Sequence, residues 1–321
     1  MVLTAAIVAL LASGPATAPE ASPAAAPRVH ALRIQVLSTM LADEGIGEWG
    51  FAALVEADGH RLLFDTGNHP TTVLDNAREM HLDLAQVPEV VLSHSHWDHT
   101  GGLLTLRRAV QEAHPEALRR VHVGRGLFWS RPNPDGSEFN LPLRERDNYA
   151  AAGLVFVEHD GPQQIWPGVW LTGPVPRVHP ERNYGRPRQV RAPQGLVEDT
   201  IPEDQSLVFD TDRGLVILTG CGHAGIVNTV DYARRIVRPA PIHAIVGGLH
   251  LYQLPDDRLD WTADQLKQAG LENLLGAHCT GIEAVYRIRQ RAGLTRKACA
   301  VGAVGSTFVL GEGIDPRDLA R

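Results

Sequence analysis

The sequence has few cysteines, no excess of positive charge, and a first apolar run that is too short to cross a bilayer. Three cysteines in 321 residues are too few for a scaffold held together by disulfide bonds. The 37 acidic residues outnumber the 30 basic ones, and the formal net charge of −7 argues against a nucleic-acid-binding protein that relies on a basic surface. With 44% hydrophobic and 21% charged residues, the composition is typical of a globular protein with one large α/β domain or two small ones.

The first 28 residues read as a signal-like or disordered segment. The apolar run at 1–12 is followed by small residues that include Ala16 and Ala18, as in an export signal. No Lys or Arg precedes the run, and Pro19 follows the best cleavage site, so the signal is imperfect. We expect a periplasmic or secreted protein without a stable membrane anchor, with a cytoplasmic location as the alternative.

From residue 29 onwards, short apolar runs alternate with helix-like stretches, which favours a layered α/β domain over 29–321. Strands are expected at residues 31–37, 51–56, 61–64, 89–92, 120–123, 155–158, 169–172, 205–209, 215–219, 243–246, 273–276 and 306–310. Helices are expected at residues 71–80, 101–114, 226–236, 256–269 and 282–292. The stretch 125–200 is rich in Pro, Gly and Arg, and we expect it to form a loop insertion over one face of the domain.

A dense group of metal-binding residue types follows the apolar run at 90–92. His94 and His96 point to the same side of an extended chain and can bind one ion together, whereas a turn after them would bring Asp98 and His99 to a second ion. Imidazole and carboxylate groups suit zinc, iron or manganese, and fewer than four protein ligands per ion leave room for water. The sequence therefore predicts a metal centre at the end of a buried strand.

This His-x-His-x-Asp-His motif resembles the metallo-β-lactamase superfamily of metal-dependent hydrolases. The resemblance implies a four-layer αββα sandwich with the metal ions at one edge. It also implies that Asp65, in the Asp-Thr-Gly segment 65–67, orients the metal loop by hydrogen bonds instead of binding metal.

Two later strand ends extend the resemblance. In most of the superfamily a bridging Asp stands where this chain has Cys221, which is either a thiolate ligand or an inert buried cysteine. The third histidine of the first metal site is assigned to His223, with His122 and His179 as alternatives. The last ligand of the second ion is assigned to His278.

Further segments resemble one subgroup, whose members are labelled 7,8-dihydropterin-6-methyl-4-(β-D-ribofuranosyl)-aminobenzene-5′-phosphate synthase or simply metallo-hydrolase. They are residues 48–50, 220–225, 247–250 and 278–281. In the third segment His250 follows two glycines, so it either contacts substrate or donates a proton, or it is a packed structural histidine.

The leading hypothesis is a dinuclear metallo-hydrolase. His94, His96 and His223 would hold one divalent ion, Asp98, His99 and His278 the other, and a hydroxide between the ions would attack a small anionic or phosphorylated substrate, with Asp98 and His250 assisting. Zinc is the expected metal, with iron or manganese as alternatives. Five arginines of the expected loop insertion could bind a phosphate or carboxylate, or could simply be solvated: Arg177, Arg182, Arg186, Arg188 and Arg191.

Three alternatives stay open at this point. The chain could be a transferase that acts on a pterin- or phosphoribosyl-type substrate, as the subgroup label implies. It could also be a binding protein that uses the metal site without turnover. Finally, Cys221 and Cys279 could form a disulfide if the chain is exported. The oligomeric state is open, and no nucleic-acid partner is expected.

Overall fold

The computed structural model describes residues 1–2, 26–183 and 188–320, and within them two large β-sheets face each other. The first sheet contains β1 (Leu32–Ser38), β2 (Ala52–Ala57), β3 (His60–Phe64), β4 (Glu89–Leu92), β5 (Arg120–Gly124), β6 (Val155–His159), β16 (Thr307–Val309) and β17 (Gly313–Asp315). Its strand order is β17-β16-β1-β2-β3-β4-β5-β6.

The second sheet contains β7 (Gln163–Trp166), β8 (Val169–Leu171), β11 (Ser206–Thr211), β12 (Gly214–Thr219), β13 (Ile242–Gly247), β14 (Asn273–Gly276) and β15 (Cys299–Val301). Its order is β15-β14-β13-β12-β11-β8-β7. A separate hairpin is formed by β9 (Gln189–Ala192) and β10 (Gly195–Glu198).

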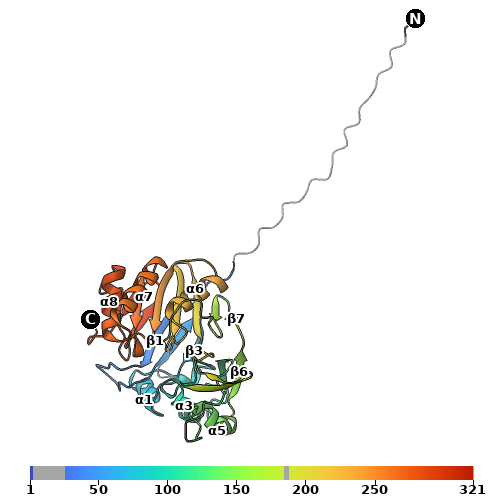
Figure 1. Cartoon of the computed structure of the whole chain (residues 1–321), viewed down its shortest axis with the longest axis vertical. Coiled ribbons are helices and arrows are strands. Elements are labelled where there is room, and N and C mark those ends of the chain that lie inside the picture. Colours follow the sequence, from blue (N-terminus) through green and yellow to red (C-terminus); the bar gives the residue numbers. More distant parts are fainter. Residues whose placement is uncertain (3–25, 184–187, 321) are drawn as a thin grey trace.

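Helices cover the outer face of each sheet (Figure 1). The helices are α1 (Thr72–Glu79), α2 (Trp97–Thr100), α3 (Leu103–Val110), α4 (Leu141–Arg144), α5 (Arg146–Ala151), α6 (Ile226–Ile236), α7 (Asp256–Gln268) and α8 (Ile282–Ala292), with 3-10 turns η1 (Leu84–Gln86) and η2 (His278–Thr280). Helices α6, α7 and α8 lie on one side of the molecule, whereas α1, α3 and α5 lie on the other. The expected four-layer αββα sandwich is confirmed.

Three apolar clusters explain why these layers hold together. One fills the space between the sheets, and each of the other two lies between a sheet and its helices. Strand β4 contacts two of these clusters: Val91 packs in the cluster between the sheets, whereas Val90 and Leu92 pack in the cluster toward the helices. A strand that is buried on both faces needs apolar residues at consecutive positions, and this is why the run before the histidines is continuous.

The observed elements match many of the expected ones. Strands β4 and β14 and helices α6 and α8 have the expected bounds. The helix expected at 101–114 is present in a shorter form, α3, and a separate short helix, α2, precedes the expected range. Strands β7, β9, β10, β15 and β17 were not expected; each has only three or four residues, too few to show a clear hydrophobic period.

The stretch 125–200 contains more regular structure than loops alone. Its described residues form α4, α5 and the β9–β10 hairpin, and they supply β6 to the first sheet and β7 and β8 to the second. Most of the signal-like segment, residues 3–25, lies outside the described residues.

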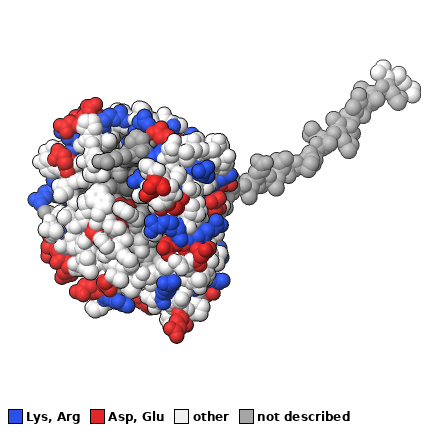
Figure 2. Space-filling view, turned by 60° about the horizontal axis from the view of Figure 1, so that its bottom comes forward, with Lys and Arg blue, Asp and Glu red and all other residues white. Residues whose placement is uncertain are grey.

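Among the helices of the described residues, none has the length and apolar character needed to span a bilayer. On the face shown in Figure 2, basic and acidic side chains are interspersed, in keeping with the small net charge.

Candidate metal centre

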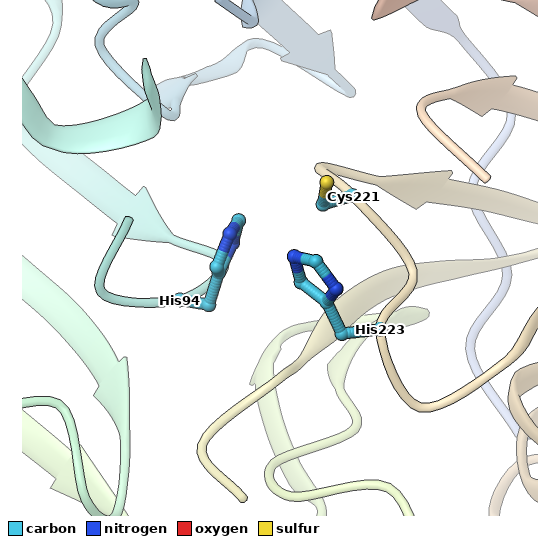
Figure 3. A group of neighbouring side chains, drawn as sticks. All are labelled: His94, Cys221 and His223. Atoms are coloured by element: carbon cyan, nitrogen blue, oxygen red, sulfur yellow. The ribbon is translucent and has the colours of Figure 1, made fainter. Parts of the chain in front are cut away.

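The metal-type residues gather at one edge of the sandwich, where parallel strands of both sheets end. Strand β3 is parallel to β4, and β12, β13 and β14 are parallel to one another, so the loops that follow them lie at the same edge. These loops are residues 93–96, 220–225, 248–250 and 277–281. Figure 3 shows His94 entering from one side while Cys221 and His223 enter from the other.

Three histidine rings from these loops form a compact group. The ring centroids of His94 and His96 are 4.6 Å apart, and that of His223 lies 4.7 Å from the first and 4.9 Å from the second. Because the group draws on loops of both sheets, it depends on the two sheets being packed together. A Cβ at position 220 would collide with Ser93 and Asp65, so the glycine there is needed for the close approach of the two loops.

Hydrogen bonds fix which ring nitrogen of His94 and His223 faces the site. Ser93 Oγ donates to Asp65, so it accepts from His94 Nδ1, 2.9 Å away. His223 Nδ1 donates to the Asn183 carbonyl oxygen at 2.5 Å. Each ring therefore carries its proton on Nδ1 and presents a lone pair on Nε2. Both Nε2 atoms are buried without a hydrogen-bond partner, as expected of atoms that serve as metal ligands.

Asp65 holds the histidine loop in place, as the resemblance implies. Its carboxylate accepts hydrogen bonds from the backbone N–H and the hydroxyl of Ser93 and from His99 Nδ1, each at 2.7 Å. This arrangement orients the His99 ring so that its Nε2 faces inward, the usual task of an outer carboxylate at a metal site.

A second group lies next to the first. His278 Nε2 is 3.3 Å from His99 Nε2 and 3.4 Å from Asp98 Oδ2. Two nitrogen ligands of one tetrahedral zinc ion, with bonds of 2.0–2.1 Å, are about 3.3–3.4 Å apart. The spacing thus fits shared coordination of one ion. His278 and Asp65 have positive φ angles of 47° and 57°, uncommon values outside glycine that indicate a geometry imposed by the surroundings.

At four of the site residues the environment favours the protonation state that a metal needs. Burial lowers the pKa of His94 and of His223 well below the usual imidazole value, and neighbouring histidines add to the effect. Burial also lowers the pKa of His96 to about 4. Burial opposes ionisation of Asp98, but the charge of His99 and a hydrogen bond from His278 hold the pKa of this carboxyl below its usual range. Neutral imidazoles and an ionised carboxylate are the forms that bind divalent ions. His278 is the exception: burial opposes its protonation, but the neighbouring Cys279 and Asp98 raise its pKa to about 10, so a metal ion would have to displace a proton from this ring.

Three tight sets of potential ligand atoms share Cys221. The sets are His94, Cys221 and His223; His99, Cys221 and His278; and Cys221, His250 and Cys279, with the atoms of each set within 4.8 Å of one another. His96 lies beside the His94 and His223 rings of the first set, and Asp98 lies beside His278 of the second. The residues present therefore fit divalent metal ions, and Cys221 stands between two histidine groups.

The superfamily model with the description "Metallo-beta-lactamase superfamily" matches residues 50–237, more than half of the chain. The chain belongs to the metallo-β-lactamase superfamily. Its sequence is 27% identical, over 248 residues, to the 7,8-dihydropterin-6-methyl-4-(beta-D-ribofuranosyl)-aminobenzene-5′-phosphate synthase of Methanocaldococcus jannaschii; the match covers 73% of this chain and 82% of the relative.

Solved structures are similar as well. The crystal structure of Tm1679, a metal-dependent hydrolase of the β-lactamase superfamily, has a TM-score of 0.66 and 25% identity, and the match covers 86% of this chain and 98% of that one. A diphosphatase of the PhnP family has a TM-score of 0.52 with 14% identity and covers 88% of this chain and 98% of its own, which shows a shared fold.

The alternatives for the third histidine lie elsewhere in this superfamily member. His122 contacts His159 on the neighbouring strand, with 3.0 Å between ring nitrogens. His179 binds the Asp231 carboxylate at 2.6 Å. Neither joins the metal-type groups, so the geometry favours His223.

A pocket of about 210 Å³ opens onto the site. Its walls include aromatic residues to which the sequence analysis gave no role: Trp49, Trp97, Phe139 and Tyr252. Trp97 is 58% exposed. Its position between His96 and Asp98 is the sequence feature that could have predicted its place in the pocket. His250, Cys221 and Cys279 also line the pocket, and the two cysteines are unbonded thiols.

Of the five candidate arginines, one is a pocket residue among those described. Arg188 lines the pocket, and its guanidinium lies 3.7 Å over the Phe139 ring. Arg177 instead donates to the backbone carbonyls of residues 200 and 201, and Arg182 pairs with Glu198. Arg186 lies outside the described residues.

A buried arginine that the sequence analysis missed supports the histidine loop. Arg131 is 1% exposed and pairs with Asp199 and Glu203, each at 2.7 Å. Glu203 in turn accepts a hydrogen bond from the backbone N–H of Ser95, between His94 and His96. Arg131 lies in a stretch with several other arginines, so the neighbouring sequence does not indicate that it supports the histidine loop.

Proposed function

We propose that this superfamily member is a metal-dependent hydrolase that binds two divalent ions, with zinc as the expected metal, and acts on a small anionic or phosphorylated molecule. The inward lone pairs of His94 and His223, buried and unpartnered beside a pocket, are the observation on which the proposal rests. A buried polar atom without a partner is costly, so its presence on two facing rings supports a bound cation.

Each ion would have its own group of residues. His94, His96 and His223 would hold the first ion, and Asp98, His99 and His278 the second, while Cys221 lies within reach of both groups. When bound, two such ions activate water and stabilise negative charge that develops on the substrate.

The chain's own residues would bind the substrate and move protons. Arg188 at the pocket rim would bind an anionic group, since a guanidinium suits phosphate and carboxylate. His250 lines the pocket beside His223, with ring centroids 4.4 Å apart, and could deliver a proton to a leaving group. The aromatic walls would exclude bulk water from the bound substrate.

A synthase is the second candidate function. The 27% identity to the Methanocaldococcus jannaschii synthase over most of the chain favours it. A synthase of this kind would use the same metal residues but would transfer the activated group to an acceptor other than water. Product analysis with and without added acceptors separates the two functions.

Metal content is the direct test of the proposal. We expect His96→Ala and His278→Ala to lose bound metal, with affinity down by more than about 100-fold, because even outer partners of metal ligands are worth 10–100-fold. The fold should survive in both variants. Elemental analysis of protein purified without added metal gives the measurement, and circular dichroism checks the fold.

The control is His243→Ala, which removes a buried histidine that pairs with Glu272 outside the site. Wild-type metal content in both site variants would refute the ligand assignment. Metal binding without turnover on ester, phosphodiester, lactone and lactam panels, together with a retained ligand, would instead favour a binding protein.

A further inference from the structure

Two thiols meet at the point where the two histidine groups adjoin. Cys221 follows β12, Cys279 lies in the turn η2 after β14, and their sulfur atoms are 3.0 Å apart. A disulfide bond is about 2.05 Å long, so closing it requires a movement of about 1 Å. Both sulfur atoms are buried, and Cys279 Sγ also lies 3.7 Å from the Cys221 carbonyl oxygen.

We propose that Cys221 and Cys279 form a redox-modification site, in which a disulfide between them withdraws Cys221 from the metal centre and switches metal binding off. The metal-binding part of this inference rests on the proposed function. The thiol chemistry does not, and it can be measured separately.

The position of Cys221 is the reason for the coupling. Cys221 belongs to all three sets of potential ligand atoms, and Cys279 belongs to one of them. A thiolate binds zinc well, but a disulfide sulfur carries no such charge. Oxidation would therefore remove the donor that both histidine groups share, whereas reduction would restore it.

Small oxidants can reach this pair. Both cysteines are buried, at 2% and 0% exposure, yet both line the same pocket that opens onto the site. Cys299 differs: it lies on β15, donates to the Val285 carbonyl oxygen at 3.5 Å, and is not a lining residue of that pocket. The third cysteine thus serves as an internal control.

The chemistry balances with a diazene oxidant such as diamide. One cysteine sulfur adds to the N=N bond, and the other sulfur then attacks the first, so that the S–S bond forms as the S–N bond breaks. Diamide is reduced by two electrons to the hydrazine, which takes up the two thiol protons. His250 Nδ1 is 3.2 Å from Cys221 Sγ and is placed to accept a thiol proton during the step. A dithiol reductant reverses the reaction by thiol–disulfide exchange.

The experiment compares wild type, Cys279→Ala and Cys299→Ser, each treated with diamide and then with dithiothreitol. In wild type we expect denatured thiol counts to fall from three to one, with a Cys221–Cys279 cross-link in peptide maps. The affinity for zinc should fall at least about tenfold, the loss typical of a disrupted metal site, so the metal content should fall and should return after reduction and re-addition of zinc. Metal-free protein should oxidise faster than loaded protein.

The two variants separate the cysteines. Cys299→Ser should form the cross-link and lose metal as wild type does, whereas Cys279→Ala should keep its metal in diamide. Three thiols remaining in treated wild type, or a cross-link with unchanged metal content, would overturn the proposal. Absence of metal in the reduced protein would refute the proposed function, while the thiol counts would still decide whether the pair forms a disulfide.

Discussion

Two buried aspartates at the metal edge, one in each half of the sandwich, show how differently the same side chain can be used. Asp65 follows β3 and is 0% exposed; Asp204 precedes β11 and is 2% exposed. Asp65 accepts three hydrogen bonds, two from Ser93 and one from His99. Asp204 accepts a hydrogen bond from the backbone N–H of Ala224, at 2.8 Å, but burial, together with the nearby charge of Glu203, raises its pKa to about 6.

Asp65 orients a metal-type histidine, whereas the main effect of Asp204 is the cost of burying its charge. The Asp65 carboxylate accepts hydrogen bonds at both oxygens, and the bond from His99 Nδ1 fixes the His99 ring. The Asp204 carboxylate is desolvated more than it is compensated, so its ionisation costs free energy in the folded protein. We therefore expect Asp204→Asn to raise the stability of the folded protein, and Asp65→Asn to lower its affinity for metal.

The largest effect is expected for Asp204→Asn in metal-free protein. The folded pKa of about 6 lies above the ordinary value of 3.8, so the folded state binds more protons than the unfolded state between about pH 4 and 6. Wild type should lose about 3 kcal/mol of unfolding free energy as the pH rises through this window. The variant lacks the ionisation, so it should match wild type near pH 4 and exceed its stability by up to that amount at pH 7.

Urea denaturation at pH 4, 5, 6 and 7 measures this difference. Asp58→Asn is the matched control: Asp58 is an exposed turn residue whose carboxylate accepts from the backbone N–H groups of His30 and Ala31. Parallel stability curves for wild type and Asp204→Asn across the window would contradict the raised pKa.

Asp65→Asn should weaken metal binding by about 10–100-fold. Asparagine tolerates the left-handed backbone that Asp65 adopts, so the loop should keep its course. If the new carbonyl oxygen keeps the Ser93 N–H, the amide NH₂ faces His99 Nδ1 and favours the tautomer with its proton on Nε2, which cannot bind metal. Competition with a chromogenic zinc chelator measures the affinity.

For this second change Asp58→Asn again serves as the control, because it too has a positive φ, 46°. Equal zinc affinities in wild type and Asp65→Asn would show that the carboxylate is dispensable for orienting His99.

The same contrast explains what the sequence could predict. The residues from His94 to His99 predict a metal site, because four metal-binding side chains lie close together in the sequence and directly after a buried strand. Continuous apolar runs such as β4 likewise predict the fold. The other residues of the site, such as Cys221, His250 and His278, follow three separate strands, β12, β13 and β14. Spacing could not choose between His223, His122 and His179, because that choice depends on how the two sheets pack together.

Supporting residues were the least predictable. Arg131 acts through Glu203, 72 residues later, and Asp204 reaches Ala224, 20 residues later, so no local pattern reveals either contact. The short helix α2 was not expected, because a single turn of four residues has no measurable hydrophobic period.

The smallest effect is expected at the pocket rim, where Arg188→Gln tests the proposed anion contact. Arg188 is exposed, donates to Asn133 Oδ1 at 3.3 Å and stacks on Phe139, so its contact with a substrate anion should contribute about 1 kcal/mol or less. We expect KM for bis(p-nitrophenyl) phosphate to rise about three- to fivefold with kcat little changed, and KM for the neutral ester p-nitrophenyl acetate to stay the same. Arg182→Gln, which removes the partner of Glu198 in the same stretch, is the control. An equal rise for both substrates would assign Arg188 to the shape of the pocket wall and not to anion binding.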